Sequence, residues 1–115
     1  MKAVGIIGYK KSGKTTLGVR LAAELAQKGL VVGVINHTVE NIDLPSADST
    51  QYSHVSGFVA VMAQQETEII LKGEQKIDEI LRYFHGDVLV MEGFKDNKRL
   101  PKIVCLRDES EKKDL

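Results

Sequence analysis

The residues with the clearest chemical potential stand at positions 8–15, which read Gly-Tyr-Lys-Lys-Ser-Gly-Lys-Thr and match the phosphate-loop pattern G-x-x-x-x-G-K-[ST]. Glycines let such a loop curl so that successive backbone N–H groups point into one concavity, where phosphate oxygens fit. We expect Lys14 to reach the β- and γ-phosphates of a nucleotide, and the Thr15 hydroxyl to hold a Mg²⁺ ion that bridges them. Lys10 and Lys11 can strengthen the positive field, although solvated lysines are the commoner occupants of a loop tip. The candidate nucleotide-binding residues of this loop are Gly8, Lys11, Ser12, Gly13, Lys14 and Thr15.

A phosphate loop that uses Mg²⁺ also needs an acidic group near the ion, and two carboxylates flank the apolar run at 88–91. Asp87 precedes the run and Glu92 follows it, so an extended chain would separate them by about 16 Å. Only the carboxyl end of a parallel strand adjoins the phosphate loop. We therefore expect Glu92 to orient a metal-bound water or to accept a proton from an attacking water. Asp87 is expected to lie at the opposite rim of the sheet, where its carboxylate would cap backbone N–H groups or contact solvent.

A second candidate segment follows the apolar run at 30–35. His37 comes just after this run, at the strand end where ligands bind in an open parallel sheet. From residue 39 to residue 53 the composition turns polar and lacks an apolar period, which indicates a loop that orders around a ligand. Asp43 and Asp48 in this loop are explained by turn formation and helix capping as well as by ligand binding.

The elements that position these residues begin with a strand, a loop, a helix and a second strand. Apolar residues at helical spacing after the phosphate loop predict the helix, and Gly29 is its expected stop. Such a unit is parallel and right-handed by default. The predicted class is α/β, a mostly parallel sheet with flanking helices of the P-loop NTPase type, in which two middle strands could pair as an antiparallel hairpin. The expected strands span residues 2–7, 30–35, 58–63, 67–71, 87–93 and 102–106. The first expected helix begins at Thr15 or Thr16 and ends at 28, and the second spans 75–84.

The whole chain sets broad limits on function. Its 115 residues suit one domain, which we place at 1–107, followed by a charged tail at 108–115 that is expected to fray. Because 16 basic residues balance 16 acidic ones, wholesale nucleic-acid binding is not expected. No apolar run reaches the roughly 18 residues of a membrane span, so we expect a cytoplasmic protein. Cys105 lies in an apolar run, where a small buried thiol is the ordinary occupant.

Taken together, these segments resemble the molybdopterin-guanine dinucleotide biosynthesis protein B family (MobB). The resemblance implies a GTP-binding, homodimeric accessory protein with slow GTPase activity. It would use Mg²⁺, help attach a guanine nucleotide to the molybdenum pterin cofactor, and work beside a separate nucleotidyltransferase. It also puts Gly13, Lys14, Thr15 and Thr16 on phosphates and Mg²⁺, and it puts His37, Asp48 and Glu92 near the γ-phosphate and metal. The matching segments are 8–16, 32–38, Asp43 with Asp48 and Ser49, 87–95 and 101–103.

The chain also departs from the family pattern. Asn36 stands where the family usually has lysine, a Gly-Lys-Asp run appears as Ser46-Ala47-Asp48, and the chain is several tens of residues shorter. No Asn/Thr-Lys-x-Asp motif for reading guanine is present, so the preference for GTP is inherited from the resemblance. Two other functions are open: a nucleotide-gated adaptor without turnover, and a small-molecule kinase. The kinase would need a lid that carries arginines, and only Arg99 stands in a candidate lid loop.

Overall fold

The computed structural model describes residues 1–38, 51–52, 54–113 and 115. Contacts divide the chain into two compact units: Met1–Val39 with Phe84–Leu115, and Glu40–Tyr83. Asp43 and Asp48 lie outside the described residues, so the predictions for them stay predictions. Within the described part of the chain, no helix has both the length and the apolar composition that crossing a bilayer requires.

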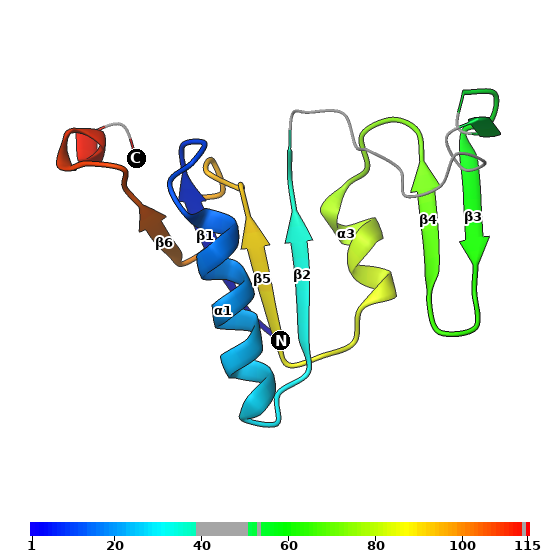
Figure 1. Ribbon diagram of the computed structural model, residues 1–115, viewed down its shortest axis with the longest axis horizontal. Helices are drawn as coiled ribbons and strands as arrows, with labels where there is room; N and C mark the ends of the chain where they lie inside the picture. Colours follow the sequence, from blue (N-terminus) through cyan, green and yellow to red (C-terminus); the bar gives the residue numbers. More distant parts are fainter. Residues whose placement is uncertain (39–50, 53, 114) are drawn as a thin grey trace. The chain divides into compact units, whose positions relative to one another are not determined.

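The first unit is built on a four-stranded sheet in the order β2-β5-β1-β6 (Figure 1). All three strand pairs are parallel, which confirms the expected parallel sheet. The two central strands coincide with apolar runs of the sequence, because a strand covered on both faces needs apolar residues at consecutive positions. The strands of this sheet and the helix beside it are β1 (Lys2–Gly8), α1 (Lys14–Gln27), β2 (Val32–Asn36), β5 (Val88–Glu92) and β6 (Lys102–Cys105).

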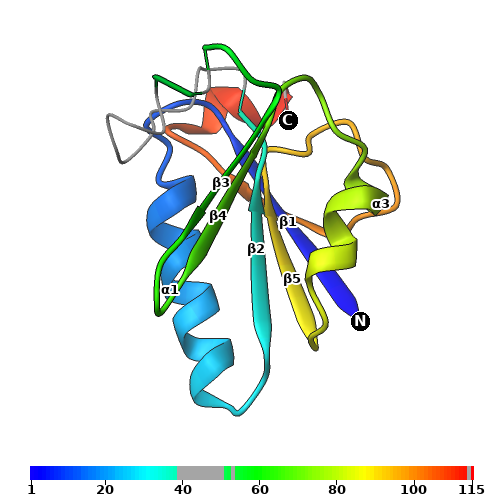
Figure 2. The ribbon, with the colours of Figure 1, turned by 90° about the vertical axis from the view of Figure 1, so that its right-hand side faces the viewer.

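The core of this unit lies in its two central strands, β1 and β5. Helix α1 runs along one face of the sheet (Figure 2), where a Cβ built on Gly18 would lie 3.6 Å from Cδ1 of Ile6. On these strands the most buried apolar side chains are at most 4% exposed: Ile6, Ile7, Leu89, Val90 and Met91.

Strand β2 was expected to be covered on both faces, and this is wrong for Val34, which is 59% exposed. Val34 pairs with Val90, which in turn pairs with Val4, so these three side chains share a face of the sheet. The residue before it, Gly33, lies on the other face, where an added Cβ would come within 2.9 Å of the Phe84 ring. Because β2 is an edge strand, it has a neighbour in this sheet on one side only.

The second unit contains an antiparallel pair, β3 (Phe58–Met62) and β4 (Thr67–Leu71), which confirms the predicted hairpin. The helix expected at 75–84 is much shorter, because α3 spans only Ile77–Ile80 and continues as the 3-10 helix η1 (Leu81–Tyr83). Phe84, the next residue, already belongs to the first unit, where its ring packs against Gly33. The helical segment therefore ends before Phe84.

The C-terminal residues do not all fray as expected. Glu109–Lys113 form a 3-10 helix, η2, and one of its carboxylates, Glu111, is only 5% exposed. The sequence pattern misled because a run of charged residues is usually solvated, whereas here Arg107 and Glu111 neutralise each other. The bounds predicted for a nucleotide-binding domain stay a prediction.

Candidate functional site

The predicted phosphate loop connects the end of β1 at Gly8 to the start of α1 at Lys14, one or two residues before the helix start expected at Thr15 or Thr16. Gly13 has φ +92° and Lys11 has φ +61°, so the backbone takes the left-handed conformation twice within three residues. The Ser12 N–H donates a hydrogen bond to the carbonyl oxygen of Tyr9 over 3.2 Å. These features curl the loop, as the motif predicts.

At the start of this loop, crowding by neighbouring atoms requires glycine at position 8. A Cβ at this position would lie 2.6 Å from the carbonyl oxygen of Cys105 and 2.6 Å from Oγ of Ser12. The Ser12 Oγ is buried and has no hydrogen-bond partner in the described part of the chain. Because an unpaired buried hydroxyl is costly, this atom is ready to donate to an oxygen that enters the loop.

Lys14 occupies the first position of α1, and its ammonium group folds back over the loop. Its Nζ donates to the carbonyl oxygen of Gly8 over 2.6 Å and approaches that of Tyr9 at 3.3 Å. Both acceptors are neutral, so a phosphate oxygen would be a stronger partner for the same charge. The positive charge therefore lies where the motif requires it.

Thr15 and Glu92, which are 77 positions apart, meet at the carboxyl end of β5. The Thr15 hydroxyl donates to Oε1 of Glu92 over 2.9 Å. The strand register explains the contact, because Glu92 pairs with Ile6 and thus shares the face that α1 covers. A hydroxyl and a carboxylate are hard oxygen donors of the kind that Mg²⁺ prefers.

Asp87 lies at the other end of β5, as expected from strand length. Its Oδ2 accepts a hydrogen bond from the backbone N–H of Val31 over 2.7 Å, and its own N–H donates to the carbonyl oxygen of Val31 over 2.8 Å. This carboxylate joins two chain segments at the rim of the sheet away from the phosphate loop.

His37 follows β2 at the carboxyl edge, but its ring lies beside Phe94, with ring centroids 5.3 Å apart. Its backbone N–H donates to the carbonyl oxygen of Glu92 over 2.9 Å. Gly93 permits this approach, because an added Cβ would lie 2.6 Å from the carbonyl oxygen of His37. Since side chains alternate along a strand, Asn36, which pairs with Glu92, shares the face of that carboxylate. The sequence pattern points to His37 as the candidate at this strand end and does not single out Asn36.

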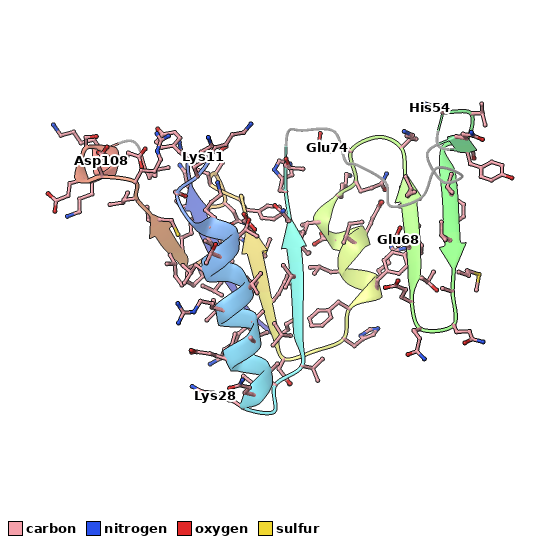
Figure 3. All side chains as sticks on the ribbon, in the orientation of Figure 1. Lys11, Lys28, His54, Glu68, Glu74 and Asp108 are labelled. Carbon is pink, nitrogen blue, oxygen red and sulfur yellow. The ribbon has the colours of Figure 1, made fainter. Side chains whose placement is uncertain are left out.

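The remaining predicted binding residues lie at the same edge. Thr16 is an exposed residue of the first turn of α1, and Lys11 is exposed in the loop itself (Figure 3). In the described residues, no group of three or more His, Cys, Asp or Glu side chains gathers as a metal centre. That result is compatible with Mg²⁺, which is commonly held by one or two protein oxygens together with phosphates and water.

Sequence reasoning missed a contact between the loop and the C-terminal segment. The guanidinium carbon of Arg107 lies 5.1 Å from the centre of the Tyr9 ring. The same side chain donates through Nε to Oε2 of Glu111 over 2.6 Å, and its Nη2 is 2.5 Å from that oxygen. This hydrogen bond lowers the pKa of Glu111 and raises that of Arg107. The only sequence signal was the four-residue spacing of opposite charges.

Comparisons with known proteins agree with this architecture. The family model described as "Molybdopterin guanine dinucleotide synthesis protein B" matches residues 3–115. A protein of Methanocaldococcus jannaschii is 33% identical over 117 aligned residues, which cover 95% of this chain and 49% of that protein. The molybdopterin-guanine dinucleotide biosynthesis adapter protein of Haemophilus influenzae is 32% identical, with coverage of 95% and 65%. The chain thus spans about half to two thirds of the length of these relatives.

A solved structure shows the same fold. The crystal structure of a MobB protein homolog from Bacillus stearothermophilus superposes with a TM-score of 0.73 at 25% sequence identity. The match covers 96% of this chain and 67% of that one. The α/β class with a parallel central sheet is therefore shared with a protein of known structure.

Proposed function

The chain belongs to the molybdopterin guanine dinucleotide synthesis protein B family, and from this premise we propose that it is a GTP-binding adapter in the synthesis of that cofactor. The name of the Haemophilus influenzae relative supports the adapter role. In this proposal the protein acts as a homodimer beside a nucleotidyltransferase that joins the guanine nucleotide to the molybdenum pterin. The phosphate loop holds the nucleotide. The preference of the protein for a guanine nucleotide is inferred from its family membership.

One observation carries the nucleotide-binding part of the proposal: the 2.9 Å contact between Thr15 and Glu92 directly beside the loop that Lys14 covers. A Gly-rich turn between a strand and a helix can arise for packing reasons alone. A carboxylate brought from a distant strand to the hydroxyl that follows the loop lysine has no such packing reason. This arrangement supports binding of a triphosphate together with a divalent cation.

Thr15 and Glu92 are the residues that would hold Mg²⁺, because they supply adjacent hard oxygen atoms. A bound ion would supply the positive charge that neutralises phosphate oxygens. Lys14 would move from the loop carbonyls to the phosphates, and Ser12 would donate its unpaired hydroxyl. Beside the ion, Glu92 would also orient a bound water, because its Oε1 lies 2.9 Å from the Thr15 hydroxyl.

Hydrolysis in this proposal is slow. The arginine nearest the loop in the described contacts is Arg107, and its guanidinium is held by Glu111 and the Tyr9 ring. Stabilisation of the transferring phosphoryl group then rests on Lys14 and the cation. His37 and Asp48 complete the proposed surroundings of the γ-phosphate, as the family resemblance implies.

Nucleotide binding and phosphate release by the purified chain test the proposal. We expect GTP to bind more tightly than ATP in the presence of Mg²⁺ and phosphate to appear slowly. Lys14→Ala should weaken GTP binding about 100-fold, because charged hydrogen bonds to the phosphates are lost. Lys28→Ala is the matched control: this exposed lysine follows the other end of the same helix (Figure 3) and should change nothing.

Other outcomes would redirect the assignment. A stoichiometric GTP complex that releases no phosphate would indicate a nucleotide-gated adaptor without turnover. Phosphate transferred to an added small acceptor would indicate a kinase. Equal and negligible binding by the unchanged protein and by Lys14→Ala would contradict the nucleotide site itself.

A further inference from the structure

Strand β6 brings the C-terminal segment to the phosphate loop. Gly8, the last residue of β1, pairs with Cys105, the last residue of β6. The chain that leaves β6 therefore runs beside the chain that enters the loop. Both ribbon views place η2 at the loop end of the sheet (Figures 1 and 2), and Asp108 lies at the same end of α1 as Lys11 (Figure 3).

Arg107 is held unusually firmly for a residue near the surface. Its side chain is 50% exposed, yet Glu111 binds it through Nε and Nη2 at 2.6 and 2.5 Å. The other oxygen of the same carboxylate accepts the backbone N–H of Arg107 over 2.8 Å. Exposed arginines normally sample many rotamers, and fixing one costs side-chain entropy. The buried Glu111 thus sets the direction of the guanidinium.

The fixed guanidinium faces Tyr9, and Tyr9 organises the loop through its backbone. Its ring lies 5.1 Å from the guanidinium carbon, within the range of a cation–π contact. Its carbonyl oxygen accepts the N–H of Ser12 and is approached by Nζ of Lys14. A force that restrains the Tyr9 ring therefore restrains the two loop residues that hydrogen-bond to this carbonyl.

We propose that Tyr9, Arg107 and Glu111 form a latch that keeps the phosphate loop curled, with Arg107 as a positioning residue for nucleotide binding. This inference rests on the proposed function, because it names a control on the same site. Arg107 acts through Tyr9 and does not itself hold the phosphates. Because coupling between two sites is reciprocal, a nucleotide in the loop must in turn stabilise η2.

Hydrogen exchange and GTP affinity, measured together, test the latch. In the nucleotide-free protein, Arg107→Met and Tyr9→Leu should each speed exchange of the amides of residues 10–13 about threefold. Each should also raise the Kd for GTP about threefold, the range expected for an exposed cation–π pair. The double variant should match either single variant, because both break the same contact. GTP added to the unchanged protein should slow exchange at residues 109–113.

Matched variants distinguish loss of the latch from a simple change of charge and from nonspecific destabilisation of the fold. Tyr9→Phe keeps the ring and should behave as the unchanged protein. Glu109→Gln removes an exposed carboxylate from the same 3-10 helix, and Arg20→Met removes an exposed arginine from α1, so neither should move the loop amides. Arg107→Lys keeps the charge but loses the planar fork that Glu111 grips, and should fall between the unchanged protein and Arg107→Met.

Each outcome decides the matter. The latch is overturned if the loop amides of Arg107→Met exchange at the rate of the unchanged protein. It is also overturned if those of Arg107→Lys do so. Faster loop exchange with an unchanged Kd for GTP overturns the link to nucleotide binding. If the unchanged protein binds no GTP, the proposed function fails, and the exchange measurement alone still accepts or rejects the latch. Should Arg107→Met not fold, Arg107→Lys and Tyr9→Leu provide the same comparison.

Discussion

Strand β5 carries a carboxylate at each end, and the two accept hydrogen bonds of similar length from different kinds of donor. At the amino end, Asp87 accepts the backbone N–H of Val31 over 2.7 Å. At the carboxyl end, Glu92 accepts the hydroxyl of Thr15 over 2.9 Å. A backbone donor must be paired for the fold to form, whereas a hydroxyl can turn to another partner. The first contact therefore belongs to the fold, and the second is available to a ligand.

The surroundings of the two ends differ in the same way. Around Asp87 the contacts join main-chain atoms: its carbonyl oxygen accepts the N–H of Lys2 over 3.0 Å, and its N–H is bound by Val31. At Glu92 the carbonyl oxygen likewise accepts a backbone N–H, that of His37, but the carboxylate is bound by the Thr15 hydroxyl, which can turn to another partner. The length of β5 thus separates two rims of the sheet. We call the rim at Asp87 the structural rim and the rim at Glu92, beside the phosphate loop, the chemical rim.

The sharpest test of this difference is Glu92→Gln. The amide oxygen can still accept the Thr15 hydroxyl, so the fold should persist, but the negative charge that attracts a cation is lost. We expect GTP binding in the presence of Mg²⁺ to weaken about 10- to 100-fold, as for other groups that orient a bound metal. Titration calorimetry with GTP in Mg²⁺ and in EDTA measures the effect.

The EDTA titration is the control within this experiment. Without a divalent cation the variant should bind GTP no more weakly than the unchanged protein, because only repulsion between carboxylate and phosphate has been removed. An equal loss of affinity with and without Mg²⁺ would contradict a role for Glu92 beside the cation.

Asp87→Ala tests the other end and should have the opposite profile. The Val31 N–H loses its acceptor near the surface, so the free energy of unfolding should fall by about 1 kcal/mol. For a chain of this size, the melting temperature should drop by about 4 °C. The Kd for GTP should not change. Thermal unfolding of Asp87→Ala and of the exposed control Asp96→Ala provides the measurement, and weaker GTP binding by Asp87→Ala would break the division of β5 into two rims.

Much of this contrast could be predicted from sequence, because strand length and parallel topology follow from local patterns. The run at 88–91 is apolar throughout, which marks a central strand, and its flanking carboxylates then have to lie at opposite rims. The phosphate loop is likewise determined by glycine positions and the following helix. Parallel topology also predicts that Glu92 lies at the edge of the sheet that adjoins the phosphate loop, and its hydrogen bond from the Thr15 hydroxyl agrees with that position.

What the sequence could not supply were contacts set by tertiary neighbours. The orientation of His37 depends on the ring of Phe94, which no periodicity reveals. Phe84, expected to be the last residue of a helix at 75–84, instead packs against Gly33, a position far away in the chain. The pairing of Arg107 with Glu111 lies in a charged run whose composition predicts solvation. In each case the deciding interaction is invisible to local propensity.

The smallest expected effect concerns a third carboxylate, Glu111, which lies near the chemical rim but is bound like a structural group. Its hydrogen bonds with Arg107 hold the pKa of Glu111 below the ordinary value of 4.5, while burial and, to a smaller extent, the charge of Asp108 oppose this shift. A carboxylate whose pKa is lowered by folding contributes stability above its unfolded pKa and loses it as the pH falls through its folded pKa. The unchanged protein should therefore exceed Glu111→Gln in stability at about pH 7. The difference should begin to shrink as the pH falls below 4.5 and disappear once the pH is below the lower folded pKa of Glu111. Urea unfolding of both proteins at several pH values measures it, with Glu109→Gln as the control that should show no such trend. A difference that persists unchanged at low pH would mean that Glu111 stabilises the segment by packing rather than by its charge. It would contradict the claim that the charge of Glu111 holds the Arg107 guanidinium.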